Sequence, residues 1–241
     1  MPESRLVEHY ETKYRDADAL RVEPVSIVTQ PRDRFQSAVR LALQRPGGRY
    51  LEIGAGSGTC ALALLDRFDG LVLTELAPVR VSALANLFYG NPRVTVLQND
   101  IESAPLPFSN DYFDTVVMVA VIEHLFDPVA ALQKLNRVLK PGGRLILDTP
   151  NIAKWTRRIK LAAGYFPSTA SRDEGLLCYD GHTPTDLYDD GHLHYFTFRS
   201  LRRLCLERAG FSRVEAFGYG PRGLGVIWPQ MFSEIAIVVW K

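Results

Sequence analysis

The chain has 241 residues, of which 46% are hydrophobic and 23% charged, so it can bury a full core and is too apolar to be disordered. Its 28 Lys and Arg residues nearly balance 27 Asp and Glu residues, and this net charge of +1 predicts no nucleic-acid partner. The three cysteines, Cys60, Cys178 and Cys205, are far apart, which excludes a Cys-rich zinc cluster and a disulfide framework.

The N-terminal stretch 1–18, MPESRLVEHYETKYRDAD, lacks the apolar core of a secretory signal. No later stretch approaches the ~20 consecutive apolar residues that span a bilayer. We therefore expect a cytoplasmic protein. Residues 1–45 are predicted to form an N-terminal cap segment followed by a helix within 24–45.

Short apolar runs alternate with helical patterns between residues 49 and 149. Strands are predicted at 49–54, 71–75, 93–100, 113–121 and 143–150, and helices at 57–68, 77–90 and 127–143. The last helix has Asp127 as its expected N-cap, Pro128 at its first position and a Pro-Gly-Gly end. Strands this apolar favour a parallel sheet covered on both faces, so the predicted class is α/β, doubly wound.

The remaining third of the chain has a different pattern. Residues 151–196 lack clean periodicity and are rich in Gly, Pro, Asp, His and Tyr, as is typical of a functional lid. Residues 197–211 predict an amphipathic helix that ends at Gly210, and 212–220 and 231–241 are strand-like.

The stretch LEIGAGSG (51–58) ends a strand in three alternate glycines and opens a helix. Such a turn brings backbone N–H groups close to a ligand with no side chains between them, which suits a nucleotide-like molecule. The dinucleotide fingerprint G-x-G-x-x-G needs a third glycine at position 59, where this chain has Thr59. A dehydrogenase is therefore disfavoured.

Together these motifs resemble class I S-adenosylmethionine-dependent methyltransferases, in the branch typified by ubiquinone-biosynthesis O-methyltransferases. The resemblance covers about residues 45–218, and includes the runs FDTVVMVAVIEHLFDP (113–128), RVLKPGGRLILDTPN (137–151) and HYFTFRSLRRLCLERAGF (194–211). It implies a seven-stranded, mostly parallel, Rossmann-like sheet. It also implies a methyltransferase domain at 46–241, with 151–196 as its substrate lid.

The resemblance implies a site for S-adenosylmethionine. Glu75 matches the carboxylate that accepts hydrogen bonds from the ribose hydroxyls, and Asp100 and Ile101 match the pair that holds the adenine. An acid at the end of the second strand, about 20 residues beyond the glycine turn, is also where a ribose diol is bound in related folds. The alternatives are a solvated loop acid for Glu75 and a turn cap for Asp100. The full predicted set is Glu52, Gly54, Ala55, Gly56, Gly58, Glu75, Leu76, Asp100, Ile101, Ala120 and Tyr14.

Glu123 and His124 raise the question of a metal. In the ubiquinone-pathway relatives an acidic residue three positions before this pair completes a set linked to a divalent metal. Here that position is Ala120, which removes one oxygen ligand. We therefore predict no metal, and expect the pair to start the helix that follows and to shape the pocket floor.

His192 and His194 are the candidate catalytic residues. At i and i+2 on an extended segment they would share one face, and histidine is well suited to take a proton from an acceptor hydroxyl. The alternatives are hydrogen bonds that fix the loop, and a metal site with Asp189 or Asp190.

The segment KWTRRIKLAAGYF (154–166) mixes basic and apolar residues. We interpret it as an ordinary solvated helix face; the alternative is weak contact with a membrane surface or a lipid-linked substrate.

The predicted function is methyl transfer to a small-molecule acceptor, at a hydroxyl oxygen. Nitrogen or carbon acceptors and a non-catalytic cofactor-binding partner remain as alternatives.

Overall fold

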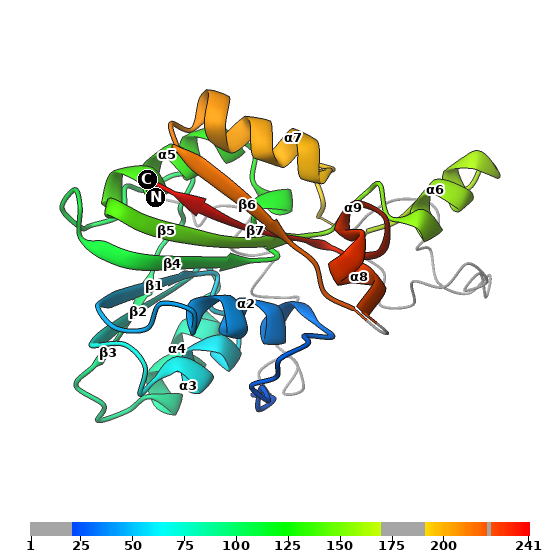
Figure 1. The fold of residues 1–241 in the computed structure, drawn as a ribbon. Helices are drawn as coiled ribbons and strands as arrows, with labels where there is room; N and C mark the ends of the chain where they lie inside the picture. Colours follow the sequence, from blue (N-terminus) through cyan, green and yellow to red (C-terminus); the bar gives the residue numbers. More distant parts are fainter. Residues whose placement is uncertain (1–20, 170–190, 221–222) are drawn as a thin grey trace.

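The computed structural model describes residues 21–169, 191–220 and 223–241 (Figure 1). Its strands form one sheet in the order β3-β2-β1-β4-β5-β7-β6, in which β7 runs antiparallel to both neighbours and the other pairings are parallel. The strands are β1 (Arg49–Ile53), β2 (Gly70–Glu75), β3 (Val94–Gln98), β4 (Phe113–Val119), β5 (Leu139–Thr149), β6 (Arg213–Phe217) and β7 (Ile235–Trp240). The doubly wound α/β prediction is confirmed.

Helices cover both faces of this sheet (Figure 1). One layer contains α2 (Arg34–Ala42), α3 (Thr59–Leu64) and α4 (Pro78–Leu87); the other contains α5 (Pro128–Val138), α7 (Phe198–Arg203) and the π-helical turn η4 (Leu204–Arg208). Side chains alternate between the two cores: Val117 packs with the first layer, and Val116 and Met118 pack with the second. Because both faces of the inner strands are buried, β4 and β7 consist mainly of apolar residues.

Several element boundaries differ from the sequence-based prediction. α5 ends at Val138, and the Pro-Gly-Gly that was expected to end it lies inside β5, at a register shift where Gly142 has φ +74°. Met231, predicted in a strand, lies in α9 (Pro229–Phe232), because Pro229 has the fixed φ that starts a helical turn. The helix that follows β1, α3, is also shorter than the helix predicted at 57–68.

The caps of two helices agree with the sequence. Asp127 accepts a hydrogen bond from the Ala130 N–H (2.9 Å) at the start of α5, as predicted. Thr197 caps α7 in a reciprocal arrangement with Ser200. Because Asp127 starts α5, Glu123 does not belong to that helix, contrary to the prediction, but to a separate 3-10 turn, η2 (Ile122–His124).

Helices α6 (Trp155–Ala162), α8 (Leu224–Ile227) and α9 lie together at one end of the sheet (Figure 1). Glu234, just before β7, holds this end together: its carboxylate binds the Lys154 Nζ and the Arg157 Nη1, each at 2.7 Å. Burial opposes ionisation of Glu234, but Arg157 and Lys154 lower its pKa to about 2. Two of the cations predicted for a solvated face are thus turned inward. Among the described residues, no helix has the length and apolar character needed to cross a membrane.

Arg144 on β5 fixes α2 to the sheet. Its buried guanidinium donates to the backbone oxygens of Leu41 (2.9 Å), Ala42 (2.6 Å) and Arg45 (3.0 Å), at and just beyond the C-terminal end of α2. We expect Arg144→Leu to lower the free energy of unfolding by about 3 kcal/mol, since hydrogen bonds from a charged group are lost inside the protein.

Urea denaturation measures this effect. The control is Arg93→Leu, which removes only the exposed pair with Asp66 and should cost under about 1 kcal/mol. Equal loss of stability in both variants would contradict the role of Arg144.

Candidate active site

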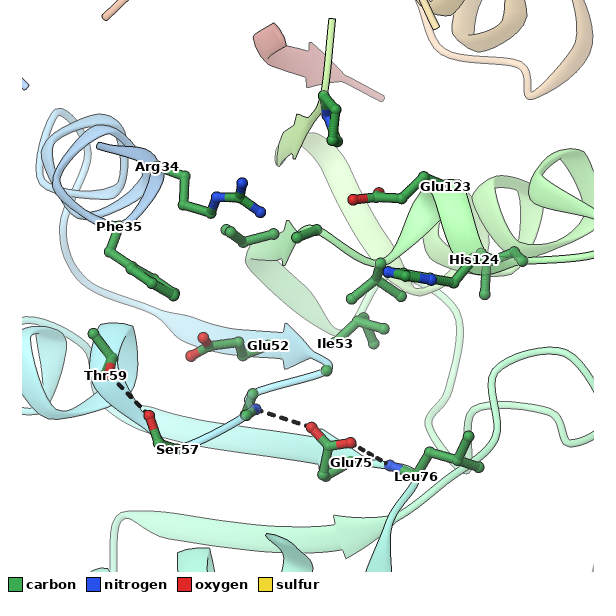
Figure 2. Close-up of a pocket in the computed structure, with 18 of the residues that line it drawn as sticks. Arg34, Phe35, Glu52, Ile53, Ser57, Thr59, Glu75, Leu76, Glu123 and His124 are labelled. Carbon is green, nitrogen blue, oxygen red and sulfur yellow. Dashed lines mark hydrogen bonds between the residues drawn. The ribbon is translucent and has the colours of Figure 1, made fainter. Parts of the chain in front are cut away.

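A cavity of about 810 Å³ opens at the carboxyl ends of the parallel strands (Figure 2). This is where open α/β sheets bind ligands. Of the residues predicted for the cofactor, nine line it: Glu52, Gly54, Ala55, Gly56, Glu75, Leu76, Asp100, Ile101 and Ala120. Gly58 is not part of the described lining, and Tyr14 lies outside the described residues.

Two positions of the glycine turn, 54 and 58, require glycine for different reasons. Gly54 has φ +66°, and a Cβ there would lie 2.5 Å from the Val121 side chain, so only glycine fits. Gly58, with φ +83°, begins α3, and a Cβ would approach Leu84 of α4 to 2.9 Å. Gly58 therefore packs α3 against α4, while Gly54 shapes the cavity itself.

Glu75, the last residue of β2, ties the glycine turn to the strand end. Its Oε2 accepts a hydrogen bond from the Gly56 N–H and its Oε1 accepts one from the Leu76 N–H, both at 2.9 Å (Figure 2). The side chain is buried within the cavity wall. A carboxylate held this way keeps free lone pairs for further donors.

Asp100 follows β3 at the same edge. Its Oδ1 accepts from the Glu102 N–H (3.0 Å) and its Oδ2 from the Ser103 hydroxyl (2.8 Å), so it does form the turn that was the alternative interpretation. The next residue, Ile101, is buried in the cavity lining. The turn thus sets an acidic and an apolar side chain side by side.

Three buried carboxyl groups lie in or behind the cavity wall. Burial raises the pKa of Glu52 to about 8, that of Glu123 to about 7 and that of Asp148 to about 8. Glu52 accepts a hydrogen bond from the Tyr50 hydroxyl (2.9 Å). Asp148 lies beside the Tyr219 hydroxyl, which together with Arg34 favours the charged form of Asp148 but does not offset its burial.

These raised pKa values predict a pH dependence of stability. The folded state holds protons on Glu52, Glu123 and Asp148 at pH values where the unfolded chain has released them, so stability falls as pH rises from about 4 to about 8. We expect Asp148→Asn, which cannot ionise, to reduce this fall by a few kcal/mol. Urea denaturation at pH 5 and pH 8.5 tests it; a fall of the same size in both proteins would contradict the assignment.

The far end of the cavity joins Glu123, His124 and His192. The side-chain atoms of these three residues that could bind a metal ion all lie within 4.8 Å of one another. The centroids of the two imidazole rings are 4.6 Å apart, in an edge-to-face arrangement. The Glu123 Oε2 accepts from the Thr149 hydroxyl (2.9 Å), whereas its buried Oε1 has no hydrogen-bond partner among the described residues. As predicted, Glu123 and His124 contribute to the wall of the pocket.

Backbone hydrogen bonds dock residues 191–194 onto η2. The Leu193 and His194 N–H groups donate to the Glu123 carbonyl (2.8 and 3.1 Å), and the His124 Nδ1 lies 2.8 Å from the Gly191 oxygen. This docking places His192 in the cavity lining.

The two candidate histidines have different surroundings. The His192 Nδ1 lies 2.6 Å from the Thr169 hydroxyl oxygen in the cavity wall. The His194 Nε2 lies 3.4 Å from the Phe126 carbonyl, and His194 is not part of the described lining. The predicted shared face therefore does not bring both into the cavity. Asp189 and Asp190, the alternative metal ligands, lie outside the described residues.

Sequence reasoning missed Arg34, at the first position of α2. Its side chain points into the cavity opposite Glu123 (Figure 2). Burial disfavours its charge, but Asp148 and other neighbouring groups raise its pKa, and it donates no side-chain hydrogen bond to another described residue. The only nearby sequence feature that could have pointed to Arg34 is Asp33, the N-cap residue that determines where α2 starts.

The chain matches the model of the family described as Methyltransferase domain over residues 29–216. It belongs to this methyltransferase family. Over 101 residues it is 32% identical to a demethylmenaquinone methyltransferase of Clavibacter sepedonicus, covering 42% of this chain and 40% of that one. Over 110 residues it is 31% identical to a ubiquinone biosynthesis O-methyltransferase of Xylella fastidiosa, covering 44% and 43%. The chain thus spans less than half the length of these curated relatives.

A solved SAM-dependent methyltransferase from Thermotoga maritima shares the fold of this methyltransferase with a TM-score of 0.56. The match covers 98% of this chain and 97% of that one at 21% identity. The predicted membership in the class I S-adenosylmethionine-dependent methyltransferases is confirmed, and with it the class of cofactor.

Proposed function

We propose that this methyltransferase transfers the methyl group of S-adenosylmethionine to a hydroxyl oxygen of a small molecule. The observation that carries the proposal is Glu75, whose carboxylate is held by the Gly56 and Leu76 N–H groups inside the cavity. The similarity to a ubiquinone biosynthesis O-methyltransferase supports an oxygen acceptor.

The cavity suits each part of the cofactor. Glu75 would accept hydrogen bonds from the ribose hydroxyls, and Asp100 and Ile101 would hold the adenine. Arg34, a cation with no hydrogen-bonded partner in the described chain, suits the carboxylate of the methionine moiety. The bound cofactor would supply a methyl group that is already activated by its sulfonium.

The protein's main contribution would then be to position the acceptor and exclude water. His192 would take the hydroxyl proton, with the Thr169 hydroxyl fixing the ring through Nδ1. The Glu123 Oε1, which lacks a partner in the described chain, would accept a second polar hydrogen of the acceptor.

Isothermal titration calorimetry with S-adenosylmethionine, S-adenosylhomocysteine and NAD tests the cofactor. We expect micromolar binding of the first two and none of NAD; binding of neither would refute the proposal. A panel of phenols, amines and activated carbon acceptors, followed by mass spectrometry of the products, then identifies the methylated atom. Methylation of the amines alone would contradict the oxygen assignment, and binding without any turnover would favour a non-catalytic partner.

A further inference from the structure

Arg157 is the buried cation of α6. Its side chain is only 3% exposed, whereas Arg158 and Ile159, the next two residues of the helix, are exposed. A cation that leaves water destabilises the fold unless charges and acceptors inside the protein replace the water. The groups that surround Arg157 therefore show what its position achieves.

The Arg157 guanidinium joins three segments of the chain. Its Nη1 donates to the Asn151 carbonyl and to the Glu234 carboxylate, both at 2.7 Å, and its Nε donates to the Ser168 carbonyl at 3.3 Å. Asn151 follows β5, Glu234 precedes β7, and Ser168 lies beyond the end of α6. A guanidinium can hold several acceptors in fixed directions, which the single ammonium of a lysine cannot do.

Two of these partners are fixed to the sheet. The Asn151 N–H donates to the Glu234 Oε2 (2.6 Å), and the Asn151 side-chain amide donates to the Ser233 carbonyl (3.0 Å). The strands that these residues adjoin, β5 and β7, are paired with each other. Arg157 thus rests on a rigid base, and its contact with Ser168 extends that base to the chain beyond α6.

Ser168 is joined directly to the residue that contacts the proposed base. Thr169 follows it, and the Thr169 hydroxyl oxygen lies 2.6 Å from the His192 Nδ1. Ser168 and Thr169 are both buried. A change in the position of the Ser168 carbonyl therefore moves the hydroxyl that His192 contacts.

His192 has a second support that does not involve Arg157. The Leu193 and His194 N–H groups dock this segment onto η2 by donating to the Glu123 carbonyl (2.8 and 3.1 Å). Loss of Arg157 should therefore leave the backbone docked and change the orientation of the imidazole ring.

The contact with Thr169 bears on which nitrogen of His192 can act as a base. A neutral imidazole carries one ring proton, so only the other nitrogen can accept a proton. For His192 to take a proton at Nε2, its Nδ1 must hold the ring proton and donate to the Thr169 hydroxyl oxygen. A displaced hydroxyl no longer favours this tautomer.

We propose that Arg157 is a positioning residue for methyl transfer. By holding the Ser168 carbonyl, it places the Thr169 hydroxyl to accept the Nδ1–H of His192, which leaves the Nε2 lone pair for the proton of the acceptor hydroxyl. The inference rests on the proposed function, in which His192 is the base. It gives a role in the reaction to a residue that the sequence-based prediction placed on a solvated helix face.

Nuclear magnetic resonance of the histidine rings tests the tautomer. Two-bond ¹H–¹⁵N spectra of protein with ¹⁵N-labelled histidine are recorded at about pH 8, where an ordinary imidazole is neutral. Comparison with His192→Ala assigns the signals. In the wild-type protein we expect the ring proton of His192 on Nδ1. In Arg157→Lys we expect a mixture of both tautomers, because a lysine that binds Glu234 cannot also hold the Ser168 carbonyl.

Kinetics with the phenol that the acceptor panel identifies give the second readout. Arg157→Lys should lower kcat by about tenfold, since small displacements of reacting groups cost up to about 100-fold. The KM for S-adenosylmethionine should stay within about twofold. In a Thr169→Val background the same substitution should have almost no further effect on kcat, because the hydroxyl through which Arg157 acts is already absent.

The matched control is Arg158→Lys, one residue along α6. Arg158 is exposed and its Nε donates to the Ala153 carbonyl, so its replacement should change neither the tautomer nor kcat. Thermal melting confirms that each protein folds. Should Arg157→Lys fail to fold, Arg157→Met removes the same contact while Lys154 still binds Glu234 (2.7 Å).

A His192 ring that carries its proton on Nε2 in the wild-type protein would overturn the proposal, as would a tautomer that the Arg157 variants leave unchanged. An equal loss of kcat with and without the Thr169 hydroxyl would also overturn it, because it would show that Arg157 only stabilises the fold. The spectra need neither cofactor nor acceptor, so failure of the proposed function and failure of this inference are distinguishable.

Discussion

Glu75→Ala should raise the dissociation constant of S-adenosylmethionine by about 100-fold or more. Two hydrogen bonds from the ribose diol to a carboxylate would be lost, each worth about 1.5–3 kcal/mol. The Gly56 and Leu76 N–H groups also lose their acceptor, so the glycine turn loses its anchor to β2. Calorimetry with the cofactor measures the change.

Two further variants make the result specific. Glu75→Gln keeps the shape and removes the charge, and we expect an intermediate loss of about tenfold. Glu207→Ala removes an exposed acid that pairs with Arg203 on the far helix layer, and it should not change affinity. Unchanged affinity in a folded Glu75→Ala protein would refute the ribose role of this residue.

Replacing His192 with alanine should lower kcat by about 100-fold or more, the usual contribution of a positioned general base, without changing cofactor affinity. His192 lines the cavity beside Glu123 and His124, with its Nδ1 on the Thr169 hydroxyl. Methyl transfer to the acceptor found in the panel is the measurement. Added imidazole should restore part of the activity if the lost group is a base.

The matched control is His194→Ala, two residues away on the same segment. His194 contacts the Phe126 carbonyl outside the described cavity lining, so its loss should change kcat by less than about threefold. Equal losses in the two variants, without imidazole rescue, would show that these histidines only fix the segment.

The sequence alone predicted the sheet and nine of the residues that line the cavity. Strand and helix periods are local, and the glycines at 54, 56 and 58 follow a strand directly, so neighbouring residues carry the signal. Glu75 and Asp100 line the cavity, as expected, because the ends of parallel strands meet at one edge of the sheet.

Where helices stop depended on longer-range packing. The Pro-Gly-Gly after α5 lies within β5 because the residues on either side of it, Leu139 and Arg144, pair with β4, and no local sequence pattern indicates this pairing. Arg144 is about a hundred residues from the α2 carbonyls that it binds, and no pattern in the sequence predicts that contact.

The acceptor end was decided by tertiary structure. Arg34 precedes the glycine turn, and Glu123 and His192 are almost seventy residues apart in the sequence, yet one cavity joins them. Only the crossover connections and the docking of 191–194 onto η2 bring these groups together, and they also separate His192 from His194. The sequence shows which reactive side chains the chain contains. The fold determines which of them line the same cavity, because contacts between distant residues depend on how the layers pack.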